Sequence, residues 1–323
     1  MTSSVLVLGA GGFIGRRIVA ALAASGVRVL AGVRQAGAGF PAGVESVIVD
    51  ATAADSIAAA ASSADAIVNS VAGDGTTIVA NAAALFTAAA GRRVVHLSTM
   101  SVYGQMHGVV DEAIDFEVLN RGDLDDYGRA KLAAEGRANA SSAAVTLLRP
   151  GIVYGPGSRE WSQLIGDLLL AQRLGDLGAA GTGACNLVHV DDVAAAVVAS
   201  LATPASIGRV YNLGHPAPVP TWNDYFRAYA EALGAGPVAA ITPGRLALEL
   251  KAFGPLRKIG EIALGVGKVG PPIRPWLTRL CAQPISLSVR RAEQELGMRW
   301  TPLATGLAQT AAWHAGRRGG AAS

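Results

Sequence analysis

Short runs of valine, isoleucine and leucine alternate with longer alanine-rich stretches through the first half of the chain. The runs cover 5–8, 27–33, 44–49, 66–69, 93–98 and 145–148. They are nearly continuous in apolar residues, as strands must be when both faces of a sheet are covered, and most are separated by enough chain for a crossover helix. The pattern predicts an α/β fold with a Rossmann-type, doubly wound parallel sheet.

This alternation breaks after Arg149, where proline and glycine cluster at 150–157 and again from about 236 to 284. Residues 188–201 and 210–213 again resemble a helix and a strand, so we expect the chain to return to the first domain before it completes a smaller, interleaved C-terminal one. The predicted organisation is a nucleotide-binding domain over 1–150 with returning segments at about 186–214, a substrate domain over 151–185 and 215–315, and a disordered tail over 316–323.

Composition and charge exclude several classes of protein. The 323 residues are 51% hydrophobic and 16% charged, as in a globular enzyme, and the net charge of +3, without basic runs among aromatics, argues against nucleic-acid binding. Cys185 and Cys281 lie too far apart in the sequence for a CxxC redox pair, and we expect buried thiols. Small molecules are the expected partners.

No stretch predicts an integral membrane span. The uncharged segment 75–91 contains Thr76, Asn81 and Thr87, and it is shorter than the roughly 20 apolar residues that a spanning helix needs. The N-terminus passes directly into the first apolar run, without the basic flank and cleavage site of a secretory signal. We expect a cytoplasmic protein.

A glycine-rich turn follows the first predicted strand. Gly9, Gly12 and Gly15 form G-x-x-G-x-x-G, and a helix is expected over 16–24. Glycine permits positive φ angles and close approach of the backbone to a pyrophosphate, and the helix N-terminus presents unpaired N–H groups to the phosphates. Packing glycines are the alternative interpretation, but the strand before the loop and the helix after it favour dinucleotide binding.

The ends of the next two strands bear on which dinucleotide binds. NAD-binding proteins often place a carboxylate after the second strand to hold the ribose 2′-hydroxyl, whereas this chain has Val33 followed by Arg34. A guanidinium pairs with a 2′-phosphate, so Arg34 favours NADP, with NAD as the alternative if Arg34 is a solvated loop residue. Asp50, after the third strand, is expected either to reach the adenine or to cap a helix that begins near Ala53.

Three residues form a candidate catalytic set. Tyr127 and Lys131 have the spacing that puts two side chains on one helix face, and an ammonium beside a phenol favours the phenolate. Thr99 follows the fifth strand, at the carboxyl edge where such sheets bind ligands. There a hydroxyl can donate to a substrate oxygen while Tyr127 exchanges a proton and the nicotinamide exchanges a hydride.

Together these motifs resemble the extended short-chain dehydrogenase/reductases of the NAD-dependent epimerase/dehydratase family. The matching segments are GAGGFIG (9–15), STMSVYG (98–104), YGRAK (127–131), LRPGIVYGPG (148–157), VHVDDVA (188–194), VYNLG (210–214) and ELGMRW (295–300). The resemblance implies that Thr99 polarises the substrate, that Tyr127 is the acid–base, and that Lys131 holds the nicotinamide ribose and tunes Tyr127. The predicted cofactor-binding residues are Gly9, Gly12, Phe13, Ile14, Gly15, Arg34, Asp50, Ala72, Tyr127 and Lys131.

Departures from the family pattern narrow the reaction. Dehydratases of the family carry acidic residues directly after the threonine, where this chain has Met100 and Ser101, and its sugar-nucleotide enzymes commonly have an asparagine in place of Ile152. The segment 149–157 instead resembles the branch that acts on 3β-hydroxysteroids and other apolar alcohols or ketones. We expect an NAD(P)-dependent oxidoreductase acting on a secondary alcohol or ketone of a fairly apolar small molecule. A sugar-nucleotide epimerase and a non-catalytic dinucleotide-binding regulator are the alternatives.

A long apolar insertion at 238–285 carries more bases than acids. The bases are Arg245, Lys251, Arg257, Lys258, Lys268, Arg274 and Arg279, and the acids are Glu249 and Glu261. Two interpretations remain open. One is a lid over an apolar substrate, near an anionic group or in peripheral contact with a membrane surface, and the other is a set of amphipathic helices with solvated charges.

Further expectations concern metals and assembly. His189, Asp191 and Asp192 are typical of a helix start rather than of a metal site, so no metal is predicted, and Arg149 is expected to anchor a loop. Members of the family often dimerise through the helices that precede and contain the tyrosine. The alanine-rich stretch 129–140 suits close helix packing, so we expect a homodimer.

Overall fold

The computed structural model describes residues 2–35, 37, 39–242, 244–246 and 275–320, and the chain divides into two compact units. The first unit comprises Met1–Val153, Leu187–Ala217 and Leu287–Trp300, and the second comprises Tyr154–Asn186, Pro218–Ser286 and Thr301–Ser323. The predicted organisation did not include the return of Leu287–Trp300 to the first unit. The roles predicted for the two domains remain predictions.

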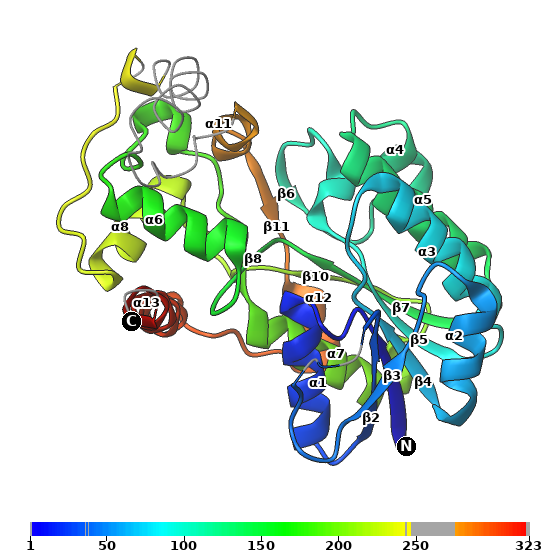
Figure 1. Cartoon of the computed structure of the whole chain (residues 1–323). Coiled ribbons are helices and arrows are strands. Elements are labelled where there is room, and N and C mark those ends of the chain that lie inside the picture. The colour runs from blue at the N-terminus through cyan, green and yellow to red at the C-terminus, as the bar shows by residue number, and fades with distance from the viewer. Residues whose placement is uncertain (1, 36, 38, 243, 247–274, 321–323) are drawn as a thin grey trace, which may run out of the picture. The chain divides into compact units, whose positions relative to one another are not determined.

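Seven parallel strands form the central sheet of the first unit (Figure 1). The order is β10-β7-β5-β4-β1-β2-β3, with bounds Ser4–Leu8 (β1), Arg28–Val33 (β2), Glu45–Ile48 (β3), Ala66–Asn69 (β4), Arg93–Leu97 (β5), Ala144–Pro150 (β7) and Val210–Leu213 (β10). Each apolar run of the sequence forms one of these strands, with ends shifted by no more than two residues. The doubly wound α/β fold is confirmed.

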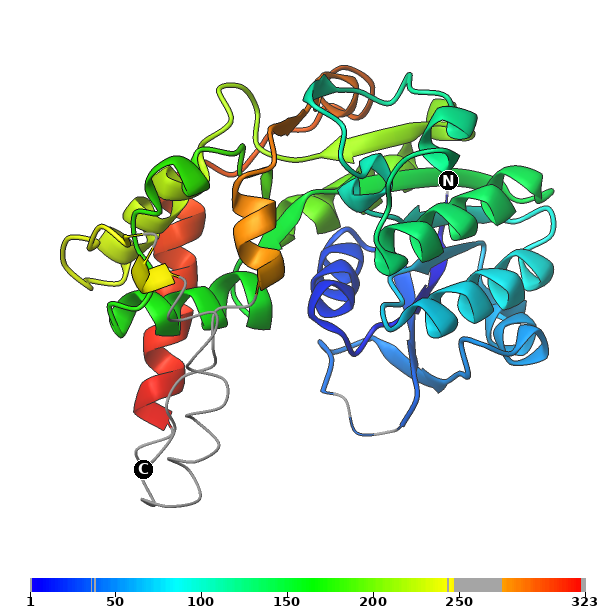
Figure 2. The ribbon, with the colours of Figure 1, turned by 90° about the horizontal axis from the view of Figure 1, so that it is seen from above.

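Helices cover both faces of this sheet (Figure 1). One face carries α1 (Phe13–Ala24) and α7 (Val190–Ala202), and the other carries α2 (Ala54–Ala60), α3 (Gly75–Ala88) and α5 (Asp126–Ala140). Successive side chains of a strand point to opposite faces. In β1, accordingly, Val5 and Val7 pack with α1 and α7, whereas Leu6 and Leu8 pack with the other three helices. Figure 2 shows α3 and α5 side by side.

Shorter elements complete the two units. The first unit adds η1 (Ala61–Ser63), η2 (Met100–Tyr103), β6 (Gly108–Val110), α4 (Phe116–Asn120), η5 (Pro204–Ser206) and α12 (Arg290–Leu296). The second contains η3 (Arg159–Leu164), α6 (Ile165–Leu170), η4 (Gly178–Gly181), α8 (Trp222–Ala232), α11 (Pro275–Cys281) and α13 (Leu303–Gly320). Strands β8 (Ile152–Tyr154), β9 (Leu187–His189) and β11 (Ile285–Leu287) lie where the chain passes from one unit to the other.

An aromatic cluster on α8 forms much of the core of the second unit. Trp222, Tyr225, Phe226 and Tyr229 are buried, and Thr221 opens the helix with a capping box. The hydroxyls of Tyr225 and Tyr229 donate to backbone carbonyls of the π-helical turn η3. These bonds give the two buried hydroxyl groups hydrogen-bond acceptors, and they hold α8 against η3.

The C-terminal end of the described chain forms a helix. Helix α13 continues to Gly320, into the segment 316–323 for which the sequence predicts a disordered tail, and 321–323 lie outside the described residues. The Arg317 guanidinium lies 5.2 Å from the ring centre of Trp313, one turn earlier, and this stacking supports the last turns. Among the described helices, none combines the length and the apolar character that a membrane-spanning segment requires.

Most of the basic insertion falls outside the described residues. This holds for Glu249, Lys251, Arg257, Lys258, Glu261, Lys268 and Arg274. Within the described part, Arg245 donates to the Gln172 carbonyl at 2.6 Å, and Arg279 is in the last turn of α11. The lid and the solvated amphipathic helices therefore both stay predictions.

Candidate active site

Glycines shape the loop between β1 and α1. Gly9 has a φ of 77°, and a Cβ on Gly15 would lie 2.1 Å from the Gly9 carbonyl oxygen. Gly12 is the N-cap of α1 without a side-chain hydrogen bond, and the first turn of α1 has no acidic residue. The side chains of Phe13 and Ile14 pack against the core, so they do not face the loop. Their backbone N–H groups lie in the first turn of α1, where N–H groups have no hydrogen-bond partner within the helix. The loop therefore fits the pyrophosphate of a dinucleotide.

Three further residues predicted to bind the cofactor are exposed in loops that follow strands. Arg34 follows β2, Asp50 follows β3 and Ala72 follows β4, so all three loops lie at the carboxyl edge of the sheet, as the glycine loop does. This edge is where doubly wound sheets bind nucleotides.

Asp50 does not cap α2. Its carboxylate accepts hydrogen bonds from the hydroxyl and the backbone N–H of Thr52, at 2.6 and 2.8 Å, and these bonds lower the pKa of Asp50. The N-cap of α2 is Ala53, without a side-chain bond. The predicted capping role is wrong because a local turn engages the carboxylate before the helix begins.

The turn that begins at Thr99 lies directly beside the start of α5. It is the N-cap of η2, and its Oγ1 accepts from the Ser101 N–H and donates to Ser101 Oγ, both at 3.2 Å. A Cβ on Gly128 would lie 2.6 Å from the Ser101 carbonyl oxygen. Glycine at 128 therefore permits the residue after Tyr127 to touch the turn that begins at Thr99.

Tyr127 and Lys131 lie one turn apart at the start of α5, whose N-cap Asp125 accepts from the Gly128 N–H. Tyr127 is 40% exposed, whereas Lys131 is 3% exposed. Lys131 Nζ lies 6.0 Å from the centre of the Tyr127 ring and donates to the Leu97 carbonyl at 3.0 Å. The structure thus gathers the three predicted catalytic residues at the end of β5.

The charge of Lys131 is adjusted by its surroundings. Burial lowers the pKa of Lys131 to about 8, and the Glu135 carboxylate opposes this shift. Burial and then the charge of Lys131 lower the pKa of neighbouring His96 to about 3. At neutral pH most molecules therefore carry a charged Lys131 beside a neutral imidazole, and an ammonium at this place favours the phenolate of Tyr127.

A buried ion pair behind these residues was missed in the sequence. Arg149 donates to the Glu135 carboxylate through Nε at 2.9 Å and through Nη2 at 2.6 Å. Glu135 and Arg149 are 1% and 3% exposed. The one signal available was the position of Glu135, a helical turn after Lys131, but such spacing is common on exposed helix faces. Arg149 had been predicted to anchor a loop, and its partners appear only in the fold.

Other polar residues have structural partners. His189 is the N-cap of α7 and accepts from the Asp191 N–H, and Asp191 and Asp192 lie in the first turn. In the described part of the chain, no group of three or more His, Cys, Asp or Glu side chains could hold a metal ion. Cys185 and Cys281 are buried free thiols.

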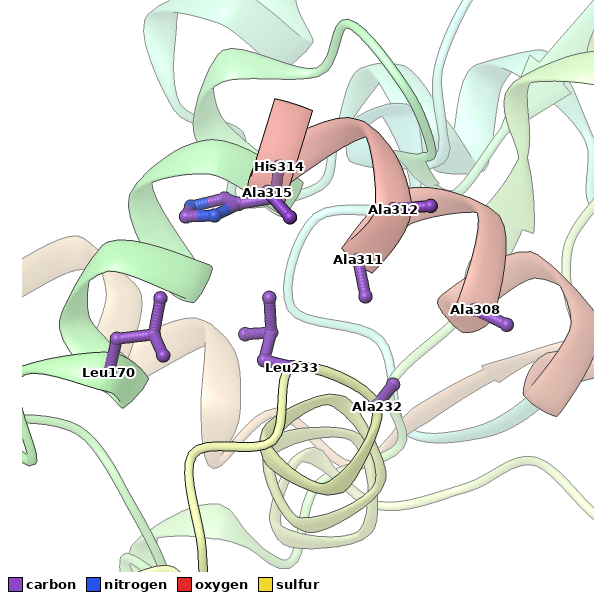
Figure 3. A pocket seen from close by; sticks show the side chains of 8 residues that line it. All are labelled: Leu170, Ala232, Leu233, Ala308, Ala311, Ala312, His314 and Ala315. Carbon is purple, nitrogen blue, oxygen red and sulfur yellow. The ribbon is translucent and has the colours of Figure 1, made fainter. Parts of the chain in front are cut away.

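A surface pocket of about 620 Å³ lies in the second unit (Figure 3). Its lining is Leu170, Ala232, Leu233, Ala308, Ala311, Ala312, His314 and Ala315. His314 is 3% exposed, and its Nε2 lies 3.1 Å from Asp167 Oδ1. None of the predicted catalytic or cofactor residues lines this pocket, so we do not assign the reaction to it.

Several characterised reductases are similar to this chain. It is 32% identical over 247 residues to the 2′-dehydrokanamycin reductase of Streptomyces kanamyceticus, a match that covers 72% of this chain and 67% of that protein. It is 32% identical over 274 residues to the 3-diazoavenalumate denitrifying reductase of a Streptomyces species, covering 76% and 86%. A 31% match to the ceramide reductase of Caulobacter vibrioides covers 119 residues, so the chain spans about a third of that relative's length, 35%.

Solved structures and a family model agree with these relatives. MoeE5 in complex with UDP-glucuronic acid and NAD has a TM-score of 0.69 and 25% sequence identity, over 98% of this chain and 99% of that one. The model of the NAD dependent epimerase/dehydratase family matches residues 5–214. That range runs from β1 past β10 and includes the glycine loop and the residues gathered at the end of β5. The chain therefore belongs to the NAD-dependent epimerase/dehydratase family, and it is an NAD(P)-dependent oxidoreductase of the short-chain dehydrogenase/reductase type.

Proposed function

We propose that this enzyme transfers a hydride between nicotinamide and a secondary alcohol or ketone of a fairly apolar small molecule. The observation that carries the proposal is the placement of Thr99 at the end of β5 beside Tyr127 and Lys131 at the start of α5. Because the strands are parallel, this site shares the carboxyl edge of the sheet with the glycine loop.

Each of the three residues has a separate role in the proposal. Bound nicotinamide supplies or accepts the hydride. Tyr127, with its exposed phenol, gives a proton to the ketone oxygen in reduction and removes it from the alcohol in oxidation. Thr99 Oγ1 donates to the same oxygen in place of Ser101 Oγ. Lys131 stabilises the phenolate, and its ammonium has N–H donors beyond the one used on Leu97 for the nicotinamide ribose.

The remaining predicted residues would hold the other end of the cofactor. The backbone of Gly9, Gly12 and Gly15, with Phe13 and Ile14, is proposed to bind the pyrophosphate, and Ala72 and Asp50 are proposed to lie against the adenosine half. Arg34 is proposed to pair with the 2′-phosphate of NADP, which its exposure at the carboxyl end of β2 supports. NAD is the alternative, and a solved relative, MoeE5, binds it.

The relatives support net oxidation or reduction rather than epimerisation. All three named above are reductases, and the match to a ceramide reductase supports a substrate with apolar character. Met100 and Ile152 occupy the positions where dehydratases and sugar-nucleotide enzymes of the family carry polar groups. A substrate that needs hydrogen bonds at these two positions would be discriminated against.

The test is a titration followed by a screen. Affinities for NADPH and NADH are measured by cofactor fluorescence, and alicyclic ketones from cyclohexanone to trans-2-decalone are then screened by loss of reduced-nicotinamide absorbance. Net oxidation that depends on a ketone and disappears in Tyr127→Phe is the expected result. If no ketone is reduced by the wild-type enzyme, the proposal is wrong.

A sugar-nucleotide epimerase is the second candidate, because MoeE5 with UDP-glucuronic acid and NAD matches almost the whole chain. An epimerase returns the hydride to the same substrate, so it consumes no cofactor. UDP-glucose is therefore included in the screen with product analysis by NMR. Its conversion to the C4 epimer without net oxidation would replace the first proposal by the second.

We also propose a cytoplasmic homodimer in which the second unit binds the substrate. The structure narrows the surface available for dimerisation, because Ala130, Ala134 and Ala138 already pack inside the first unit. The exposed positions of the same helix, such as Ala133 and Arg137, are left for a partner. Light scattering of the purified protein gives its mass in solution, and a monomeric mass at micromolar concentration would contradict the dimer.

A further inference from the structure

We infer that the buried Glu135–Arg149 ion pair is a positioning device that fixes the turn carrying Thr99 against the helix that carries Tyr127. The inference rests on the proposed roles of Thr99 and Tyr127. It assigns Glu135, Arg149, Ser98 and Tyr103 to the reaction as positioning residues, none of which touches substrate in this scheme.

The ion pair holds the beginning of the turn. Ser98, which directly precedes Thr99, donates from Oγ to Glu135 Oε1 at 2.5 Å, and its backbone N–H donates to the Leu148 carbonyl at 2.7 Å. Glu135 belongs to α5, and Leu148 belongs to β7. The residue before Thr99 is therefore tied both to the helix of Tyr127 and to the neighbouring strand.

The same pair holds the end of the turn. Tyr103 is the last residue of η2, and its hydroxyl accepts from Arg149 Nη1 at 3.0 Å and donates to Asn212 Oδ1 at 2.7 Å. The Arg149 guanidinium also lies 5.0 Å from the centre of the Tyr103 ring. Because Ser98 and Tyr103 enclose Thr99 and Ser101, the segment is fixed from both sides by one ion pair.

Helix periodicity connects this device to the catalytic residues. Tyr127, Lys131 and Glu135 succeed one another at intervals of one turn along α5. Lys131 donates to the Leu97 carbonyl, and Glu135 accepts from the Ser98 hydroxyl, so consecutive helical turns hold consecutive residues of the chain. A rotation or slide of α5 would move Tyr127 and disturb both bonds, so the distance between Tyr127 and Thr99 is set by the same contacts.

Stability alone does not account for the pair. Replacing a buried ion pair by apolar residues of similar volume is often neutral or stabilising, whereas removing one partner leaves a costly buried charge. Burial opposes the charge of Arg149, but the hydrogen bonds and charge of Glu135 outweigh it and hold the pKa of Arg149 above its usual value. Arg149 therefore stays charged, and directional hydrogen bonds to Ser98 and Tyr103 are what the pair supplies beyond packing.

The test removes the hydrogen bonds and leaves the ion pair intact. Ser98→Ala deletes the bond to Glu135, and Tyr103→Phe deletes the bond from Arg149 at the other end. Thr146→Val is the matched control, because it removes a buried hydroxyl of the same sheet that donates to the Ser206 carbonyl at 2.7 Å. Glu135→Gln is avoided as the primary variant, since it leaves the Arg149 charge buried without its partner.

Steady-state kinetics with NADPH and the best ketone of the screen are combined with amide hydrogen exchange of 98–103 in the full chain. We expect Ser98→Ala and Tyr103→Phe to lower kcat by about 10- to 100-fold, as misplacement of reacting groups does, with unchanged affinity for NADPH and faster exchange of 98–103. Thr146→Val is expected to lower Tm by a similar amount as Ser98→Ala, with wild-type kcat and wild-type exchange in this segment.

The outcomes separate this inference from the proposed function. Wild-type kcat and exchange in Ser98→Ala, together with an inactive Tyr127→Phe, overturn the positioning role and leave the proposed function standing. If the wild-type enzyme reduces no ketone, the proposed function fails. Amide hydrogen exchange of 98–103 then tests the positioning role without any activity measurement. Faster exchange in Ser98→Ala would support the role of the ion pair in fixing the turn, and unchanged exchange would overturn it.

Discussion

A Cβ atom on Gly15 would lie 2.1 Å from the carbonyl oxygen of Gly9, a backbone contact that no rotamer change relieves. Gly15→Ala is therefore expected to displace the loop between β1 and α1 and to destabilise the protein by about 1–3 kcal/mol, as overpacking does. Gly11→Ala is the control in the same loop, because its Cβ would meet Val33 Cγ1 at 3.9 Å, an ordinary contact. Urea unfolding compares the two, and equal stabilities would contradict the prediction.

Tyr127→Phe is expected to lower kcat by about 10²- to 10⁴-fold, because the variant lacks the proton that the phenol exchanges with substrate. The loss of affinity for the reduced cofactor should be much smaller than the loss of kcat, since the ring stays on α5 beside Lys131, which remains available to the cofactor. Tyr211→Phe is a control that removes a phenol bonded to Glu295 in the same unit. A similar loss of kcat in both variants would point to a structural effect rather than to the proposed acid–base role.

The free energy of unfolding of the cofactor-free protein should depend on pH through the titration of Lys131. Its pKa is lowered by burial from 10.5 to about 8, so between these values the unfolded chain binds a proton that the folded chain does not. The free energy of unfolding therefore gains a contribution that rises with pH through this window, on the order of 3 kcal/mol in total. Lys131→Met lacks this contribution.

Urea unfolding of wild type and Lys131→Met between pH 7 and pH 10 isolates this contribution, because other titrating groups are common to both proteins. The difference in unfolding free energy should move in favour of the wild type as pH rises. If the unfolding free energies of the two proteins changed with pH in parallel, the pKa of Lys131 would not be lowered by folding.

Arg34→Ala is expected to weaken binding of NADPH by about tenfold or more and to leave binding of NADH nearly unchanged, because the guanidinium contacts only the 2′-phosphate in the proposal. Arg28→Ala is the control at the opposite end of β2, where Arg28 pairs with Glu45 at 3.0 Å on the surface. Fluorescence titration measures both affinities. Equal affinities of Arg34→Ala and wild type for NADPH would remove the basis for an NADP preference.

Local patterns in the sequence determined the sheet and the chemistry that it supports. Continuous apolar runs such as 5–8 predict buried strands because a strand covered on both faces has few solvent-exposed positions, and the fold confirms this run as β1. The glycine loop and the Tyr127–Lys131 spacing are also local, since a turn and one helical repeat involve neighbours in the chain. These features predicted the family, which the comparisons show.

Tertiary structure decided what depends on residues distant in the chain. Two contacts show this: Gly128 approaches Ser101, and Glu135 pairs with Arg149. Nothing in the local sequence around one residue of each pair indicates that the other will be its neighbour. The pKa of Lys131 follows from burial, which spacing on a helix does not reveal. Sequence periodicity reports which face of an element is buried, whereas the partner on that face is chosen only when distant elements pack together.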